Sequence, residues 1–137
     1  MTEKKVKKIE YYYATGTNKT STATIRLFSG KGETLINNKS LSSYASSKEM
    51  MNSILDKPFI LTGTKDNFYF SAKTKGGGYV SQLKAISLAI SRALSKINDE
   101  YKKTLAQYNL LRRDPRMVER KKYYKVKSRK APQYSKR

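Results

Sequence analysis

The sequence predicts an α+β domain followed by a long, extended and basic C-terminal arm. Alternating apolar residues in the first half of the chain indicate β-strands, and a regular apolar stripe over residues 80–97 indicates a long helix. Because the predicted strands come largely before the helices rather than alternating strictly with them, the pattern is typical of an α+β fold. The last fifth of the chain has too few aliphatic residues to build a packed core.

The predicted strands lie between residues 11 and 74. Residues 22–28 alternate, with Ala23, Ile25 and Leu27 on one face. The turn residues 29–32 then lead into residues 34–36, which we expect to return as the second strand of an antiparallel hairpin and to end in a turn at Asn37 and Asn38. Three further segments have extended character and should add strands to the sheet: residues 11–15, 59–61 and 67–74.

Three helices are predicted. Ser46 and Glu49 form a capping box that begins a short helix over residues 47–55, and Pro58 ends it. The strongest helix covers residues 80–97, with this apolar stripe packed on the sheet: Val80, Leu83, Ile86, Ile90, Ala93, Leu94 and Ile97. Asn98 and Asp99 cap a following helix that runs to about Asn109, with an inner face of Tyr101, Leu105 and Tyr108.

The charge of the chain indicates a polyanionic partner. The 137 residues include 30 Lys and Arg against 10 Asp and Glu, a formal net charge of +20, and residues 112–137 hold twelve of the cations and two of the acids. Six of the eight arginines lie in that stretch, where guanidinium groups can fork onto phosphate oxygens and stack on bases. The alternative is a disordered tail that only keeps the chain soluble.

Most catalytic apparatus is absent from the composition. The chain has no Cys and no His, which removes zinc fingers, thiol nucleophiles, disulfide frameworks and imidazole bases, and we expect no cofactor. Ser81 and Lys84 match the serine–lysine spacing of some acyl enzymes, but the companion motifs are missing. No apolar run reaches the roughly 18 residues of a membrane span, and the first residues lack the apolar region of a secretory signal.

Two further features suit RNA. Gly76, Gly77 and Gly78 stand before the predicted long helix, where residues without side chains let a phosphate approach the backbone; the alternative is a flexible connector. Tyrosines interleave with the cations of the arm, an arrangement in which bases stack on rings while phosphates pair with Lys and Arg. A DNA-compacting protein and an enzyme of RNA metabolism are the rival interpretations.

Several blocks of the sequence occur together in one known family. Residues 13–23 (YATGTNKTSTA), Gly76-Gly77-Gly78 leading into residues 85–94 (AISLAISRAL), residues 111–122 (LRRDPRMVERKK) and the ending of residues 131–137 (APQYSKR) resemble small-subunit ribosomal protein nine of the bacterial or organellar type. The resemblance runs from about Tyr11 to Arg137. It implies a four-stranded, mostly antiparallel sheet with helices packed on it, similar to the second domain of small-subunit ribosomal protein five.

The resemblance also implies a role and a division of the chain. We expect a basic N-terminal segment (residues 1–10), a globular RNA-binding body (11–111) and the extended basic arm (112–137). The protein would be a non-enzymatic constituent of the small ribosomal subunit, in bacterial cytoplasm or in an organelle. Its partners would be ribosomal RNA and neighbouring proteins of the subunit head, together with transfer RNA in the peptidyl site; no membrane is expected.

The expected contact residues follow from the basic pattern and the resemblance together. The candidate ribosomal-RNA contacts are Lys19, Lys75, Gly76, Gly77, Gly78, Arg112, Arg113, Arg116, Arg120, Lys121, Lys122, Lys125, Lys127, Arg129, Lys130 and Tyr134. The resemblance implies that the tip of the arm meets transfer RNA through Ser135, Lys136 and Arg137.

Overall fold

The computed structural model describes residues 9–44 and 47–136. Its elements follow one another along the chain in the order β1 (Tyr11–Asn18), β2 (Ser21–Ser29), β3 (Leu35–Ile36), β4 (Lys39–Ser40), α1 (Leu41–Tyr44), α2 (Lys48–Thr62), β5 (Phe68–Lys75), α3 (Tyr79–Ile97) and α4 (Asp99–Gln107). The predicted α+β class is confirmed.

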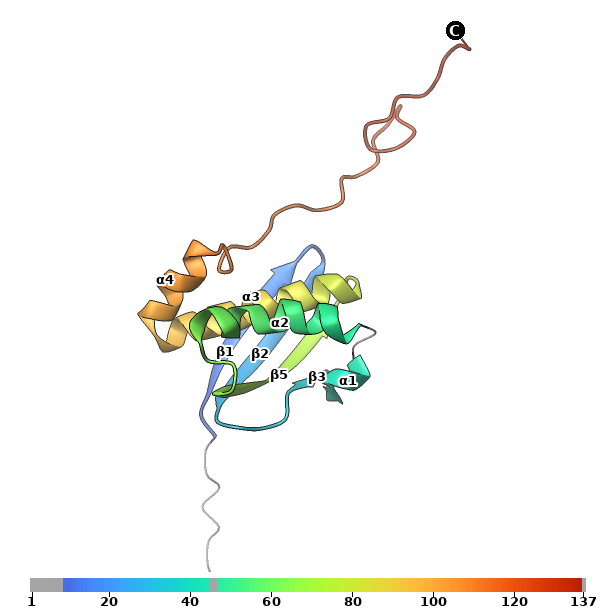
Figure 1. The fold of residues 1–137 in the computed structure, drawn as a ribbon. Helices are drawn as coiled ribbons and strands as arrows, with labels where there is room; N and C mark the ends of the chain where they lie inside the picture. The colour runs from blue at the N-terminus through green and yellow to red at the C-terminus, as the bar shows by residue number, and fades with distance from the viewer. Residues whose placement is uncertain (1–8, 45–46, 137) are drawn as a thin grey trace, which may run out of the picture.

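The sheet has five strands, in the order β1-β2-β5-β3-β4, and not the four that the family resemblance implied. Every pairing is antiparallel except that of β3 with β5, which is parallel. The predicted hairpin between residues 22–28 and 34–36 is wrong, because β1 and β5 occupy the two edges of β2 (Figure 1). The short strand β3 instead lies beside β5, where the amide of Asn37 donates to the carbonyl of Ala72 at 2.8 Å. The predicted turn at Asn37 and Asn38 is confirmed, and both residues have positive φ.

The molecule has two layers, with α2 and α3 on the same face of the sheet (Figure 1). The alternation predicted for β2 is confirmed, since Ala23, Ile25 and Leu27 are fully buried while Thr22 and Arg26 are exposed. The helices contribute the other half of the core, including fully buried Leu83, Ile86, Ile90 and Leu94 of α3. Burying such aliphatic side chains stabilises a fold by roughly 1.5–3 kcal/mol each, so this contact between sheet and α3 is the main source of stability.

Helix α2 is longer than the sequence predicts. It continues through Pro58 to Thr62, so residues 59–61 are helical and the strand predicted there is wrong. Proline lacks the amide that a helix interior uses, but its ring is buried and the next residue, Phe59, packs against Phe70 with ring centroids 6.3 Å apart. This packing keeps the chain helical past the proline. Ser47 is the N-cap and makes no side-chain cap bond, while Ser46 of the predicted capping box lies outside the described residues.

Helices α3 and α4 follow the prediction closely. The carbonyl oxygen of the Asn98 side chain accepts a hydrogen bond from the amide of Glu100 at 3.0 Å, which is the expected cap. Leu105 is fully buried on the inner face of α4. The predictions for Val80 and Tyr108 are wrong, since both side chains are exposed. Val80 lies in the first turn of α3, next to the glycine loop that follows β5, and its side chain is 40% exposed.

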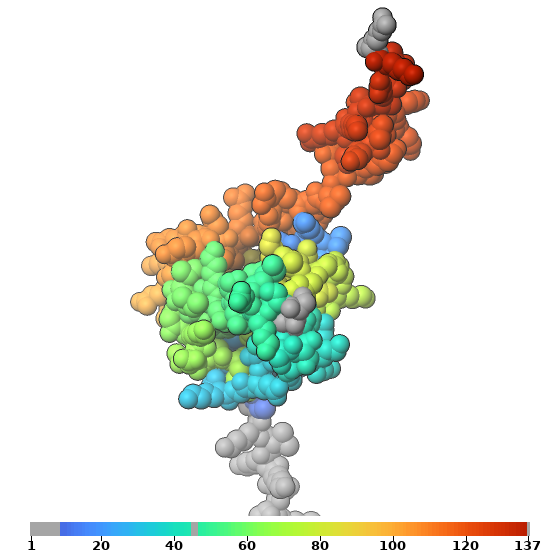
Figure 2. Space-filling model, turned by 45° about the vertical axis from the view of Figure 1, so that its right-hand side comes forward, coloured from blue at the N-terminus to red at the C-terminus, as the bar shows by residue number. Residues whose placement is uncertain are grey.

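Residues 110–136 contain no helix or strand, and from residue 115 onward almost every described residue is exposed. Figures 1 and 2 show this C-terminal segment leaving the body beside the β1–β2 hairpin. Among the described residues, no helix has both the length and the apolar character needed to cross a membrane.

Candidate nucleic-acid interface

Three parts of the chain that are distant in sequence meet at one end of the body. They are the β1–β2 turn, the glycine loop between β5 and α3, and the first residues of the C-terminal segment. We call this region the hairpin end and define it by its six cations: Lys19, Lys75, Lys84, Arg112, Arg113 and Arg116. Five of these six were predicted RNA contacts, and Lys84 was not.

The β1–β2 turn places Lys19 at the tip of the hairpin. Strand pairing runs without a break to Asn18 and Ser21, so only Lys19 and Thr20 form the loop. Lys19 has φ of 52°, a left-handed conformation that costs a residue with a side chain roughly 1–2 kcal/mol. The hairpin therefore places a lysine at the end of the sheet in a backbone conformation that costs free energy.

The glycine loop is packed against this hairpin and is not a free connector. A Cβ on Gly76 would lie 2.7 Å from the carbonyl oxygen of Thr20, and one on Gly77 would lie 1.9 Å from the Ser21 Oγ. The Ser21 hydroxyl in turn donates to the Gly76 carbonyl at 3.1 Å. A Cβ on Gly78 would meet nothing within 4 Å. The space that side chains on Gly76 and Gly77 would need is thus occupied by Thr20 and Ser21 of the hairpin. Of the three glycines, only Gly78 has open space beside it.

The first residues of the C-terminal segment are tied to the same hairpin. Leu110 and Leu111 pack on the edge of the hydrophobic core, and two residues later the Arg113 Nε donates to the Thr17 Oγ1 at 2.7 Å. Asp114 accepts bonds from the backbone amide and the guanidinium of Arg116, which lower the pKa of that carboxyl to about 2. These contacts fix the direction in which the segment leaves the body.

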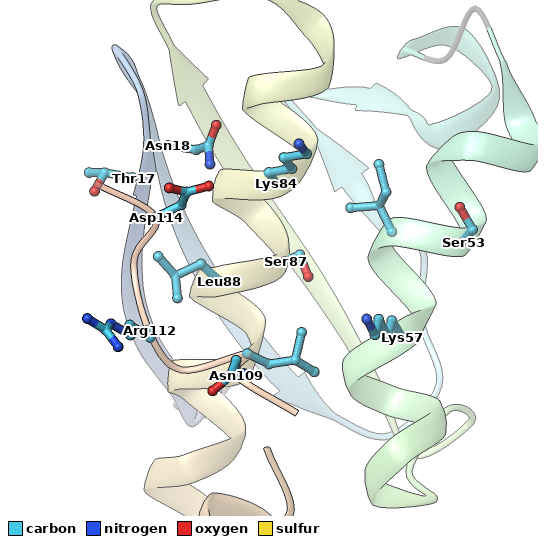
Figure 3. A pocket seen from close by; sticks show the side chains of 12 residues that line it. Thr17, Asn18, Ser53, Lys57, Lys84, Ser87, Leu88, Asn109, Arg112 and Asp114 are labelled. Atoms are coloured by element: carbon cyan, nitrogen blue, oxygen red, sulfur yellow. The ribbon is translucent and has the colours of Figure 1, made fainter. Parts of the chain in front are cut away.

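A hollow lies between α2, α3 and these residues (Figure 3). Lys57 of α2 and Lys84 of α3 line it from opposite helices, together with Arg112 and the hydroxyl groups of Ser53 and Ser87. Asp114 lies near Lys84 and is the acid in this lining. Ammonium, guanidinium and hydroxyl donors gathered in an open hollow suit a phosphate-bearing ligand.

Sequence reasoning missed Lys57 and Lys84. In the sequence, Lys84 stands out only for its serine–lysine spacing with Ser81. It stands one turn beyond the glycine loop and off the apolar stripe of its helix, and that position was a usable signal. Lys57 could not have been found, because its helix was predicted to end before it.

The remaining predicted contacts lie farther along the C-terminal segment, away from the body (Figure 1). Glu119 closes a loop there by accepting bonds from Lys122 and from the Arg129 Nε, the latter at 2.9 Å. Arg120 lies over the ring of Tyr123, and Tyr134 is 87% exposed. Arg137 lies outside the described residues. The structure therefore presents two cationic regions, the hairpin end and the distal segment.

Both regions define the class of protein. A small α+β body gathers Lys19, Lys75 and Lys84 at one end and continues into an exposed segment dense in Lys and Arg, as polyanion-binding proteins do. The described residues contain no cluster of acidic, His or Cys side chains suited to a metal ion.

Residues 16–137 match the model of the family described as Ribosomal protein S9/S16, and the chain belongs to this family. Membership makes it a structural protein of the ribosome, acting in translation within a ribonucleoprotein particle with RNA and other ribosomal proteins as partners. Proteins of this kind are typically not enzymes. The resemblance found in the sequence is confirmed at the level of this family.

Proposed function

We propose that this chain is the small-subunit protein nine of a bacterial or organellar ribosome, that its hairpin end anchors the body on ribosomal RNA in the subunit head, and that residues 112–137 form an arm that runs through the RNA. The tip of the arm, Ser135 to Arg137, reaches transfer RNA in the peptidyl site. Residues 11–111 are the folded body.

The observation that carries the proposal is the continuity between body and arm. Arg113 bonds to Thr17 on the hairpin, so the basic segment begins inside the hairpin end and continues from it. Its cations then follow one another with only Glu119 as an acid between residues 115 and 137. Such a row neutralises closely packed phosphates, and an exposed chain can order itself between RNA helices where a globular domain would not fit.

The body and the arm differ in how much apolar surface each can bury to stabilise itself. The hydrophobic core ends with Leu105 and the partly buried Leu110 and Leu111. Beyond them Met117, Val118 and Val126 are all at least half exposed. The arm therefore lacks apolar burial of its own to offset the entropy cost of ordering, and RNA contacts supply that free energy.

Co-sedimentation tests the proposal as a whole. The tagged chain should migrate with small ribosomal subunits through a sucrose gradient and should remain bound after a low-salt wash. Competition with duplex DNA provides the contrast, because a DNA-compacting protein would bind duplex DNA and structured ribosomal RNA equally well. Migration at the top of the gradient, or equal affinity for both nucleic acids, would contradict the proposal.

The role of the tip has its own experiment. Deleting residues 135–137 should leave subunit assembly unchanged and should weaken retention of transfer RNA in the peptidyl site. Lys130→Gln, which removes one arm cation and keeps the tip, is the matched control and should retain transfer RNA as the unaltered chain does. Normal retention by the deletion variant in fully assembled subunits would argue against the role of the tip.

A further inference from the structure

The face of the sheet that the helices do not cover carries a second set of side chains, which shares only Lys75 with the hairpin end. Burial alternates along the three long strands, so one set of residues faces the core and the other faces away from α2 and α3. Strand register arranges the second set in four rows across β1, β2 and β5: Tyr11–Phe28–Tyr69, Tyr13–Arg26–Ser71, Thr15–Thr24–Lys73 and Thr17–Thr22–Lys75. We call these twelve residues the open face.

The open face changes in character from one end to the other. The first row is a line of rings, with centroids 5.8 Å apart for Tyr11 and Phe28 and 5.1 Å apart for Phe28 and Tyr69. The third and fourth rows are threonines and lysines, and a shallow hollow there joins Thr22, Thr24 and Lys73 to Gly76 of the glycine loop. The polar end of the open face is thus continuous with the hairpin end.

Charge on the open face has a single sign. Arg26, Lys73 and Lys75 are its ionisable side chains other than tyrosine, all three are exposed, and no acid occupies any of the twelve positions. Arg26 stands directly across from Tyr13 and places its guanidinium 5.3 Å from the centre of the Tyr11 ring. A purely apolar partner surface would leave these cations without a counter-charge, whereas a phosphate backbone supplies one.

Tyr13 is the ring best placed to receive a base. It is 49% exposed, and among the described residues it stacks on no other ring, whereas Phe28 already stacks on Tyr69. Its backbone carbonyl is held by the Lys96 Nζ from α3 at 2.5 Å, which fixes the strand beneath it. Unpaired bases stack on exposed aromatic rings that are held in place, and a nearby guanidinium such as that of Arg26 strengthens the binding.

We propose that the open face binds a single-stranded stretch of RNA, with phosphates on Lys75 and Lys73 and a base stacked on Tyr13 beside Arg26. From the Lys75 row to the Tyr11 row the strands extend about 20 Å, at about 3.3 Å per residue, which accommodates a short unpaired segment. The inference rests on the proposed function, since it gives the same RNA partner a second surface and adds base stacking to phosphate contact.

Adjacent tyrosines provide a matched pair of variants. Tyr12 is also exposed and lies on the same strand, but it faces the opposite side of the sheet from Tyr13. Binding of the full chain to a fluorescent oligouridylate of about ten nucleotides should weaken at least about five-fold for Tyr13→Leu and less than about two-fold for Tyr12→Leu. Tyr13→Phe keeps the ring and should bind within about two-fold of the unaltered chain. Leucine keeps the bulk of the side chain, and thermal unfolding of each variant checks that β1 is intact.

Lysine variants test the phosphate half of the inference. Lys73→Gln should lower the affinity for the same oligonucleotide and reduce the slope of log affinity against log salt by about 0.7, whereas Lys103→Gln on the outer side of α4 should change neither. Equal behaviour of Lys73→Gln and Lys103→Gln would overturn the assignment.

Mapping in assembled small subunits identifies the partner. Short-wave ultraviolet irradiation and mass spectrometry should find a nucleotide adduct on Tyr13 and none on Tyr12. Protection of Tyr13 from hydroxyl radicals without such an adduct, or full accessibility of Tyr13 in the assembled subunit, would overturn the inference. If the chain co-sediments with subunits but its Tyr13 variants bind RNA normally, only this inference is refuted. If the chain does not co-sediment, the proposed function is refuted as well.

Discussion

Asp114 organises the first turn of the C-terminal segment through its bonds to Arg116. It lies on the first turn after the core and accepts bonds from both the backbone and the side chain of Arg116, which lower its pKa from 3.8 to about 2. Because the folded-state pKa is depressed, this interaction is fully present above about pH 4 and is lost as the pH falls through 2. A carboxyl-detected NMR titration should find Asp114 with a pKa near 2, and Arg116→Gln should return it toward 3.8. A pKa near 3.8 in the unaltered chain would show that this turn does not persist in solution.

Gly16 marks the closest contact between sheet and helix. A Cβ at this position would lie 2.2 Å from the carbonyl oxygen of Ala85 and 2.7 Å from the amide nitrogen of Ala89, both backbone atoms of α3. Since neither atom can move without shifting the helix, Gly16→Ala should lower the free energy of unfolding by about 2–3 kcal/mol. Gly78→Ala, where the new methyl meets nothing, is the control and should cost less than about 1 kcal/mol. Denaturant unfolding of both variants measures the difference, and equal losses would contradict the tight β1–α3 contact.

At the scale of elements, the local sequence pattern predicts an element correctly when the side chains of that element alone determine how it packs. The apolar stripe of α3 has to pack against the sheet, and Asn98 caps α4 where α3 ends. Both helices could therefore be predicted from the sequence. Helix α2 could not, because Pro58 is an ordinary stop signal that only the tertiary contact of Phe59 overrides. The pairing of β3 with β5 could not be predicted either, because a strand of two residues does not specify which strand it pairs with. Five of the six cations of the hairpin end were predicted as separate contacts, and only the topology brings Lys19 and Arg113 together with Lys84.

In the β1–β2 hairpin, fold stability and the proposed RNA contact make opposite demands on Lys19. Lys19 holds a positive φ that glycine would adopt without strain, yet it supplies a cation at the tip of the sheet. Lys19→Gly should therefore raise the free energy of unfolding by up to about 1 kcal/mol while weakening binding to small-subunit ribosomal RNA and reducing the salt slope by about 0.9. Thermal unfolding and filter binding over a salt series measure the two effects. Lys102→Gly, on the exposed side of α4 and away from the hairpin end, is the control: it removes one charge and should destabilise by about 1 kcal/mol through the helix, without changing the salt slope.

At the scale of the whole molecule, the proposal assigns different sources of free energy to the folded body and to residues 112–137. The body is held by apolar burial between one face of the sheet and α2 and α3, on which α4 packs in turn, and salt affects such burial little. Residues 112–137 hold twelve Lys and Arg and two acids, half of the total net charge of +20, and their ion pairs are exposed. Exposed pairs of this kind contribute roughly 0–1 kcal/mol. Folding of the body and attachment of the arm should therefore respond to different experimental variables.

Truncation after Leu111 separates these two contributions. The shortened chain retains Leu105, Leu110 and Leu111 and with them the whole hydrophobic core, so its thermal midpoint should stay within a few degrees of that of the full chain. If six of the twelve arm cations meet phosphates, the slope of log affinity against log salt for ribosomal RNA should fall in magnitude by about 4–5 on truncation. Circular dichroism melting and a binding series across salt concentrations give the two values. A full chain and a truncated chain with the same salt slope would mean that the arm carries its charge without contacting RNA.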